Sequence, residues 1–176
     1  TLDWTGINVI TLNNAAMTGP PVVVNGSIYV GVRGSAWSLV YGSSNDGRTW
    51  TPRASSIRIG DDRYNLLPSP DGTALWAIQS EFFELPASLW ESLDGGATWY
   101  RIDDGSFPAQ TVRIVHDPRH SDTSYALTAR GLKLGRSDPQ GRIHWQATSM
   151  WLPVHGLVFV DRIPPLSRAL VIGTDT

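Results

Sequence analysis

Acidic side chains that could form a catalytic pair occur in two predicted loops of this 176-residue chain. Asp61 and Asp62 lie in residues 55–65, and Glu81 and Glu84 lie in residues 80–87. Glycoside hydrolysis normally requires two carboxyl groups that face one sugar ring. One acid from each loop could meet on the loop face, but spacing alone does not place them within reach and acid pairs are common by chance, so we assign no catalytic residue.

The same two loops carry aromatic side chains beside the charged ones, and residues 33–38 add a further tryptophan. Aromatic rings that alternate with charges on one rim can stack on sugars or anchor a protein partner. The alternative interpretation is that Phe82 and Phe83 cap the core while the charged groups are solvated. The predicted ligand-binding residues are Trp37, Arg58, Asp61, Asp62, Tyr64, Glu81, Phe82 and Phe83.

Two histidines flank the tripeptide Asp-Pro-Arg at a spacing that suits a metal ion. These are His116 and His120. They fall in a predicted turn without an evident third ligand, so we predict a solvated turn, no metal and no cofactor. The chain has no cysteine, which excludes disulfides and thiolate metal ligands.

Tryptophans at regular intervals indicate the elements that position these loops. Trp4, Trp50, Trp99 and Trp145 are separated by 46, 49 and 46 residues. A regular period of this size is typical of an array of one supersecondary unit. We therefore expect successive copies of the same small sheet.

The last three of these tryptophans each close a run of turn-forming residues. The runs are SSNDGRTW (43–50), SLDGGATW (92–99) and SDPQGRIHW (137–145), the third one residue longer. Asp and Asn side chains hydrogen-bond nearby backbone groups, and glycine adopts the positive φ that such bends require. The predicted structural residues are Ser43, Asn45, Gly47, Thr49, Trp50, Ser92, Asp94, Gly96, Thr98, Trp99, Ser137, Gly141 and Trp145.

Short apolar stretches recur between these bends. Each period has one stretch, a turn and a second stretch, for example residues 22–24 with 27–32 and residues 64–67 with 74–79. Four short antiparallel strands in about 40–50 residues match one blade of a β-propeller. We predict an all-β fold, a single β-propeller segment over residues 1–176. Its parts are a partial blade 1–19, blades 20–56, 57–106 and 107–150, and a partial blade 151–176.

The SxDxGxTW bends resemble the Asp-box, or BNR, repeat. This repeat occurs in sialidase-like, xyloglucanase-like and sortilin-type β-propellers and in photosystem assembly factors of the same fold. Residues 116–138 also resemble a frame common in those propellers. The resemblance covers nearly the whole chain and implies that binding loops gather on the face opposite the boxes. A fold of this kind does not carry one activity with it.

A sialidase site is not supported by the residues of this segment. Sialidases, which this chain resembles in its boxes, combine an arginine cluster, a tyrosine with a glutamate, and an Arg-Ile-Pro motif that precedes the boxes. Here Arg162, Ile163 and Pro164 follow the boxes, and the chain has three glutamates. We interpret the tripeptide as a coincidence.

Net charge and hydropathy argue against nucleic acid as a partner and against a membrane span. The net charge is −2, so the sequence lacks the basic footprint of a nucleic-acid-binding protein. No stretch approaches the length of an apolar membrane span. The chain begins TLDW and ends within a partial blade, so we expect a fragment whose ring is completed by further sequence, a second copy or another subunit.

We favour a non-catalytic propeller that serves as a protein-interaction or assembly platform. Its expected partners are a protein or the remaining half of the propeller, or a glycan. The alternative is part of a sialidase- or xyloglucanase-like glycoside hydrolase, or a glycan-binding lectin. The resemblance implies an extracytoplasmic location, whether secreted, periplasmic or at the cell surface.

Overall fold

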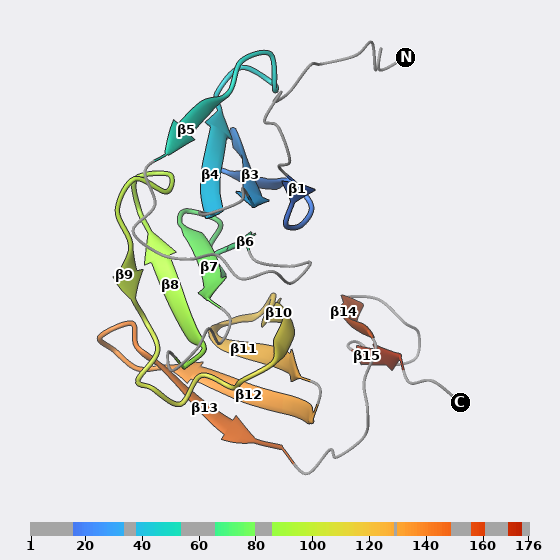
Figure 1. Ribbon diagram of the computed structural model, residues 1–176. Coiled ribbons are helices and arrows are strands. Elements are labelled where there is room, and N and C mark those ends of the chain that lie inside the picture. Colours follow the sequence, from blue (N-terminus) through green and yellow to red (C-terminus); the bar gives the residue numbers. More distant parts are fainter. Residues whose placement is uncertain are drawn as a thin grey trace. The chain divides into compact units, whose positions relative to one another are not determined.

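A computed structural model describes residues 16–33, 38–53, 66–79, 86–128, 130–148, 156–160 and 169–173, and Figure 1 labels its strands. Every regular element in these ranges is a β-strand. The all-β prediction is therefore confirmed. Within the same ranges, no helix has the length and apolar character needed to cross a membrane.

The first sheet has four strand positions, one of which is split. It contains β1 (Ala16–Met17), β2 (Val22–Val24), β3 (Ser27–Arg33), β4 (Ser38–Ser43) and β5 (Thr51–Arg53). Both β1 and β2 pair with β3, with Met17 opposite Val32 and Val24 opposite Ser27. Because β4 occupies the other edge of β3, β1 and β2 share one position. Residues 16 and 17, at the end of the predicted partial blade 1–19, pair with β3, and the Thr18 amide extends this ladder by donating to the Gly31 carbonyl.

The second sheet has the order β6-β7-β8-β9. Its strands are β6 (Leu66–Pro68), β7 (Leu75–Gln79), β8 (Ser88–Ser92) and β9 (Tyr100–Arg101). Four consecutive residues of β7, from Leu75 to Ile78, are buried. An unbroken buried run, rather than alternation, marks a strand that is covered on both faces.

The third sheet has the order β10-β11-β12-β13, with each strand antiparallel to the next. Its strands are β10 (Thr111–Asp117), β11 (His120–Thr128), β12 (Gly131–Ser137) and β13 (Ile143–Ala147). A fourth sheet is the hairpin of β14 (Gly156–Val160) and β15 (Ala169–Gly173). Three sheets of four antiparallel positions are the units that the tryptophan period predicts.

The chain divides into two compact units, residues 1–79 with 91–100 and residues 80–90 with 101–176. In the first unit, the bend after β8 packs on β3 and β4. A methyl group on Gly95 would lie 2.5 Å from the Tyr29 hydroxyl, and one on Gly96 would lie 3.2 Å from Val40. Both glycines also have positive φ, at 69° and 93°. Glycine is therefore required here by close approach as well as by backbone conformation.

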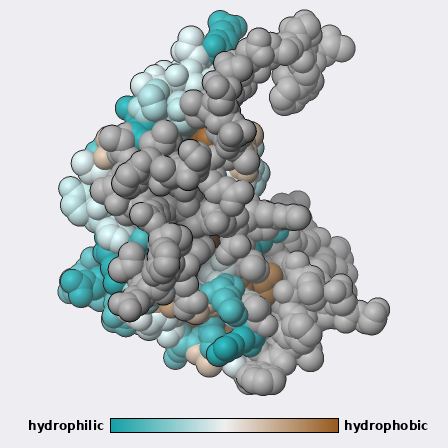
Figure 2. Space-filling model, viewed as in Figure 1, coloured by the Kyte–Doolittle hydropathy of each residue, from teal (hydrophilic) through white to brown (hydrophobic). Residues whose placement is uncertain are grey.

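Exposed apolar side chains in the described ranges are isolated ones. Met17, Val23, Leu93 and Tyr100 are the large exposed hydrophobic residues. Figure 2 shows the described part of one face as mostly teal and white, with scattered brown. Single exposed hydrophobic residues are normal on protein surfaces, so they do not mark a docking patch.

Candidate functional site

All the ligand-binding residues predicted from the sequence lie outside the described residues. They are Trp37, Arg58, Asp61, Asp62, Tyr64, Glu81, Phe82 and Phe83. Arg162, Ile163 and Pro164 lie outside as well. These assignments stay predictions, and the site is built below from the bends and from the second unit.

Side-chain hydrogen bonds brace the bend between β4 and β5. Ser43 Oγ accepts from the Gly47 amide at 2.9 Å and donates to Asn45 Oδ1 at 3.0 Å. Asn45 Oδ1 accepts from the Thr49 amide at 2.9 Å, and Asn45 Nδ2 donates to Thr49 Oγ1. The Trp50 indole donates to the Gly47 carbonyl at 2.9 Å. The Asn45 side chain thus bonds both the amide and the hydroxyl group of Thr49 across the bend.

The bend between β8 and β9 repeats this pattern with a carboxylate. Ser92 Oγ accepts from the Gly96 amide at 2.7 Å and donates to Asp94 Oδ1. Asp94 accepts from the Thr98 amide at 2.8 Å and from Thr98 Oγ1 at 2.6 Å. The Trp99 indole donates to the Gly96 carbonyl. Hydrogen bonds from Thr98 lower the pKa of Asp94 from 3.8 to about 2.

Replacing Asp94 by asparagine should reproduce the neutral bend of Asn45. A lowered pKa means that ionised Asp94 stabilises the fold above its unfolded pKa of 3.8, and that this stabilisation is lost as the pH falls through about 2. For this exposed group we expect Asp94→Asn to cost about 1 kcal/mol near neutral pH and much less near pH 2. Urea denaturation at both pH values measures it. An equal cost at both would contradict a role for the charge.

A similar brace, which the sequence analysis did not identify, holds the bend between β6 and β7. Ser69 Oγ donates to Asp71 Oδ1 and accepts from the Ala74 amide at 2.9 Å. Asp71 also accepts from the amide and the hydroxyl of Thr73. The hydrogen bond from Ser69 is the largest cause of the lowered pKa of Asp71. The sequence pattern that marks this brace is Ser-x-Asp followed by a threonine, and it lies outside the three predicted boxes.

The bend between β12 and β13 differs from the alignment made on the sequence. Ser137 lies opposite Ile143, and Trp145 lies opposite Gly135, further along the strand. Trp145 therefore does not occupy the place of Trp50 and Trp99. Asp138 braces this bend, accepting from the Gln140 and Arg142 amides at 2.9 Å each.

His144 links two carboxylates of the second unit. Its Nδ1 lies 2.6 Å from Asp104 Oδ2, and its Nε2 lies 3.2 Å from Asp138 Oδ2. The protonated ring can donate from both nitrogens at once. The hydrogen bond to Asp104, followed by that to Asp138, raises the pKa of His144. Hydrogen bonds, led by that from Ser106, lower the pKa of Asp104 to about 2.

Because the folded pKa of His144 is raised, its contribution to stability is complete below the unfolded pKa of 6.5. This contribution is lost as the pH rises through the raised value. We expect His144→Gln to lower the melting temperature clearly near pH 5.5 and much less near pH 9. Thermal unfolding monitored by circular dichroism measures it. In a background of Asp104→Asn and Asp138→Asn, the pH dependence of the effect should disappear. Its persistence there would exclude the proposed linkage.

Asp103 is the centre of a buried polar cluster, and its side chain is fully shielded from solvent. It accepts from the Leu89 amide at 2.9 Å, the Gly105 amide at 2.7 Å and both Nε and Nη2 of Arg101. Ile143, the first residue of β13, lies alongside Ile102, because the Ile143 amide donates to the Ile102 carbonyl at 2.7 Å. These bonds fix where the following loop, residues 104–110, begins.

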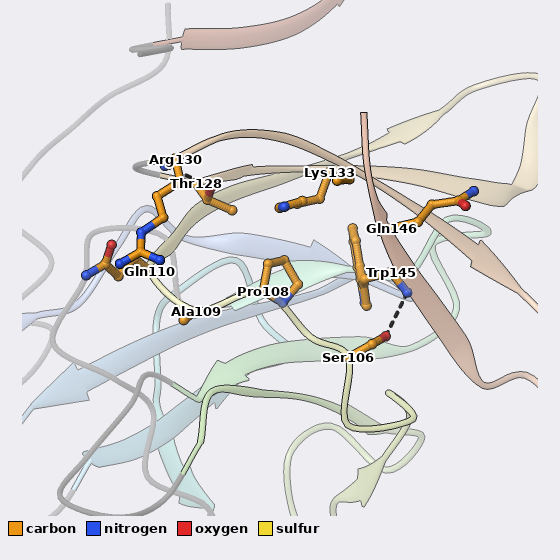
Figure 3. Close-up of a pocket in the computed structure, with 10 residues that line it drawn as sticks. Ser106, Pro108, Ala109, Gln110, Thr128, Arg130, Lys133, Trp145 and Gln146 are labelled. Atoms are coloured by element: carbon orange, nitrogen blue, oxygen red, sulfur yellow. Dashed lines mark hydrogen bonds between the residues drawn. The ribbon is translucent and has the colours of Figure 1, made fainter. Parts of the chain in front are cut away.

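This loop and the end of the third sheet line an open cavity of about 370 Å³ (Figure 3). Trp145 lies at one wall, where Phe107 meets it edge-on at 5.6 Å between ring centroids. The Trp145 amide donates to Ser106 Oγ, which holds the loop on β13. Both polar and apolar residues line the cavity, among them Pro108, Gln110, Arg130, Lys133, Trp145 and Gln146.

The cavity lies where the sequence analysis expected binding loops to gather, but its residues were not predicted. Phe107 is buried against Trp145 rather than presented to a ligand. Arg130 lies in the short connection between β11 and β12, which the sequence analysis does not include among the binding loops. Lys133 is the single lysine of the protein, which was the one available signal.

The described carboxylates serve the fold. Apart from Asp46, each of them accepts a hydrogen bond from a neighbouring group, and none lines the cavity. They are Asp71, Glu91, Asp94, Asp103, Asp104, Asp117, Asp122 and Asp138. His116 contacts Ser124 and His120 contacts Asp117, and the described residues contain no group of three potential metal ligands.

Comparisons with known proteins bear on the fold. No protein-family model matches the chain, and no curated protein matches it in sequence. A solved structure that it resembles is a GH74 enzyme from Niastella koreensis, with a TM-score of 0.58 and 17% identity. The match covers 81% of this chain and 24% of the length of that enzyme. That enzyme is a β-propeller, so the all-β chain is a propeller segment of four-stranded antiparallel blades.

Proposed function

We propose that the chain is part of a non-catalytic Asp-box β-propeller that serves as a protein-interaction platform outside the cytoplasm. One observation carries the proposal. The cavity beside the third sheet is lined by cationic, amide and apolar side chains, and none of its lining residues is an acid. Groups of these kinds bind and orient a ligand, whereas glycoside hydrolysis needs a pair of carboxyl groups.

The bends support the Asp-box part of the proposal. In the two complete copies, serine, aspartate or asparagine, and threonine make the same set of hydrogen bonds, and an indole closes each bend on a glycine carbonyl. Such side chains hold hairpins in place and leave the opposite loops free to vary. The extracytoplasmic location rests on the resemblance to exported propellers.

The test is an activity and partner assay on the protein in its natural length. Incubation with fluorogenic sialosides, xyloglucan and β-glucans should release no product above the blank. Mild cross-linking in the native cells, followed by purification, should recover a protein at fixed stoichiometry. Hydrolysis that disappears in Asp61→Ala or Glu81→Ala would overturn the platform in favour of a glycoside hydrolase.

A further inference from the structure

The cavity of the second unit has an uneven charge. Arg130, in the turn between β11 and β12, and Lys133, on β12, both line it. Neither side chain forms an ion pair or hydrogen bond within the described part of the protein, while Arg136 on the same strand lies 3.7 Å from Asp122. Lys133 is half-buried. Arg130 is exposed, and two cationic side chains that line one pocket favour an anion there.

Two amide side chains extend the polar wall. Gln110 and Gln146 each offer one acceptor and two donors, which suits a peptide backbone. Gln110 also has a φ of 56°, in the left-handed region that few residues other than glycine adopt. The turn is held by Thr111 Oγ1, which donates to the Pro108 carbonyl at 2.6 Å. Backbone strain maintained by its surroundings at a cavity wall is typical of binding sites.

The apolar wall limits what can bind. Trp145 is 8% exposed, and its indole N–H is buried without an acceptor among the described residues. One face of the ring lies on the Gly135 backbone, where a methyl group would lie 2.9 Å from three ring carbons. A ring so covered has little open face on which a pyranose could stack. In Figure 3 the ring and Pro108 form the lower part of the cavity, below Lys133.

We propose that this cavity binds a carboxylate presented by an extended segment of a partner protein, an inference that rests on the proposed platform. The guanidinium and ammonium groups of Arg130 and Lys133 bind the carboxylate, because an arginine fork matches its two oxygens. Gln110 and Gln146 bind the adjoining backbone amides. The carboxylate belongs to an acidic side group or to the carboxyl terminus of the partner, since both have the same chemistry.

An isotope label on lysine amines reports on Lys133, the single lysine of these 176 residues. Reductive methylation of the protein in its natural length with ¹³C-formaldehyde labels its amines and preserves their charges, and the Lys133 signal is the one that is absent from Lys133→Arg. The probes are four ligands: acetyl-(Gly-Glu)₃-amide, acetyl-(Gly-Gln)₃-amide, acetyl-(Gly-Gln)₃ with a free carboxyl terminus, and a trimer of galacturonic acid. The ¹³C shift of dimethyl-Lys133 is followed by NMR as each is added.

We expect saturable shifts with the glutamate peptide, the free-carboxyl peptide or both, and none with the amidated glutamine peptide. Which of the two acts identifies the source of the carboxylate. Arg130→Gln should weaken binding about tenfold or more, as expected for loss of a hydrogen bond to a charged group. Arg136→Gln is the matched control, because it removes the same charge from β12 and should leave binding unchanged. Unaltered melting temperatures exclude misfolding.

Three results would overturn the inference: equal binding of the amidated glutamine peptide, binding of galacturonate in preference to both acidic peptides, or no saturable shift with any probe. A partner assay separates this inference from the platform itself. If the cross-linked partner is recovered equally with wild type and with Arg130→Gln plus Lys133→Gln, the platform stands and the cavity is not its binding site. If no partner is recovered and a polysaccharide is hydrolysed, the platform is wrong.

Discussion

The variant Asp103→Ala is expected to lose about 2–4 kcal/mol of the free energy of unfolding, because a buried amide and a charge-assisted hydrogen bond lose the acceptor that they share. Asp103 is fully shielded, and Arg101 next to it is 38% exposed. Removal of the carboxylate therefore leaves Arg101 partly hydrated, but the Leu89 and Gly105 amides lose their acceptor. The Leu89 hydrogen bond is buried, so its amide donor without an acceptor accounts for much of the expected loss.

Urea denaturation at neutral pH, monitored by tryptophan fluorescence, measures this effect. Asp103→Asn is the matched control because it keeps the shape and one acceptor oxygen, so it should cost clearly less than the alanine variant. Arg101→Gln, which removes the exposed partner alone, should cost less than either. A loss below about 1 kcal/mol for Asp103→Ala would show that water replaces the carboxylate in this cluster.

Gly135→Ala has the second largest expected effect. A methyl group on this residue would lie 2.9 Å from three carbons of the Trp145 ring, so the indole must move away from β12. Overpacking of this kind costs about 1–3 kcal/mol. At a strand position without positive φ, alanine would otherwise be neutral or slightly stabilising, because it restricts the unfolded state.

A double-mutant cycle isolates the contact. In a Trp145→Leu background the cost of Gly135→Ala should fall below about 0.5 kcal/mol, which gives a coupling energy of about 1–2 kcal/mol between the two positions. The same displacement of the ring should weaken binding of the glutamate peptide to the cavity. Identical costs in both backgrounds would mean that the strand, and not the indole, opposes the methyl group.

The architecture could be predicted because it repeats. Apolar residues of β3, β7 and β11 recur at the same distance after each indole, so strand type and order followed from spacing. The third bend shows the limit of this reasoning. A glycine and a tryptophan alone do not define the register of a hairpin, and Asp138, one place before the expected acid, changed it.

The cavity could not be predicted for a different reason. Its walls come from three segments that only the folded ladder brings together: Ser106 with residues 108–110, Thr128 with Arg130 and Lys133, and residues 145–147. On the sequence, Arg130 and Lys133 are two cations among scattered others. Asp103 and Phe107 belong to the stretch between β9 and β10, yet both are buried and have structural roles. The aromatic residues predicted to bind a ligand, Trp37, Tyr64, Phe82 and Phe83, lie outside the described residues, and their role stays a prediction.

The divided position shared by β1 and β2 has a consequence for the solubility of the protein. Pro20 and Pro21 separate these two strands, which contain two and three residues. A proline has no N–H to donate, so this border of the sheet cannot offer an unbroken row of hydrogen-bonding groups. A fibril grows by adding strands to such a row. We therefore expect this border to resist amyloid-like stacking, and replacement of both prolines to make the protein more prone to it.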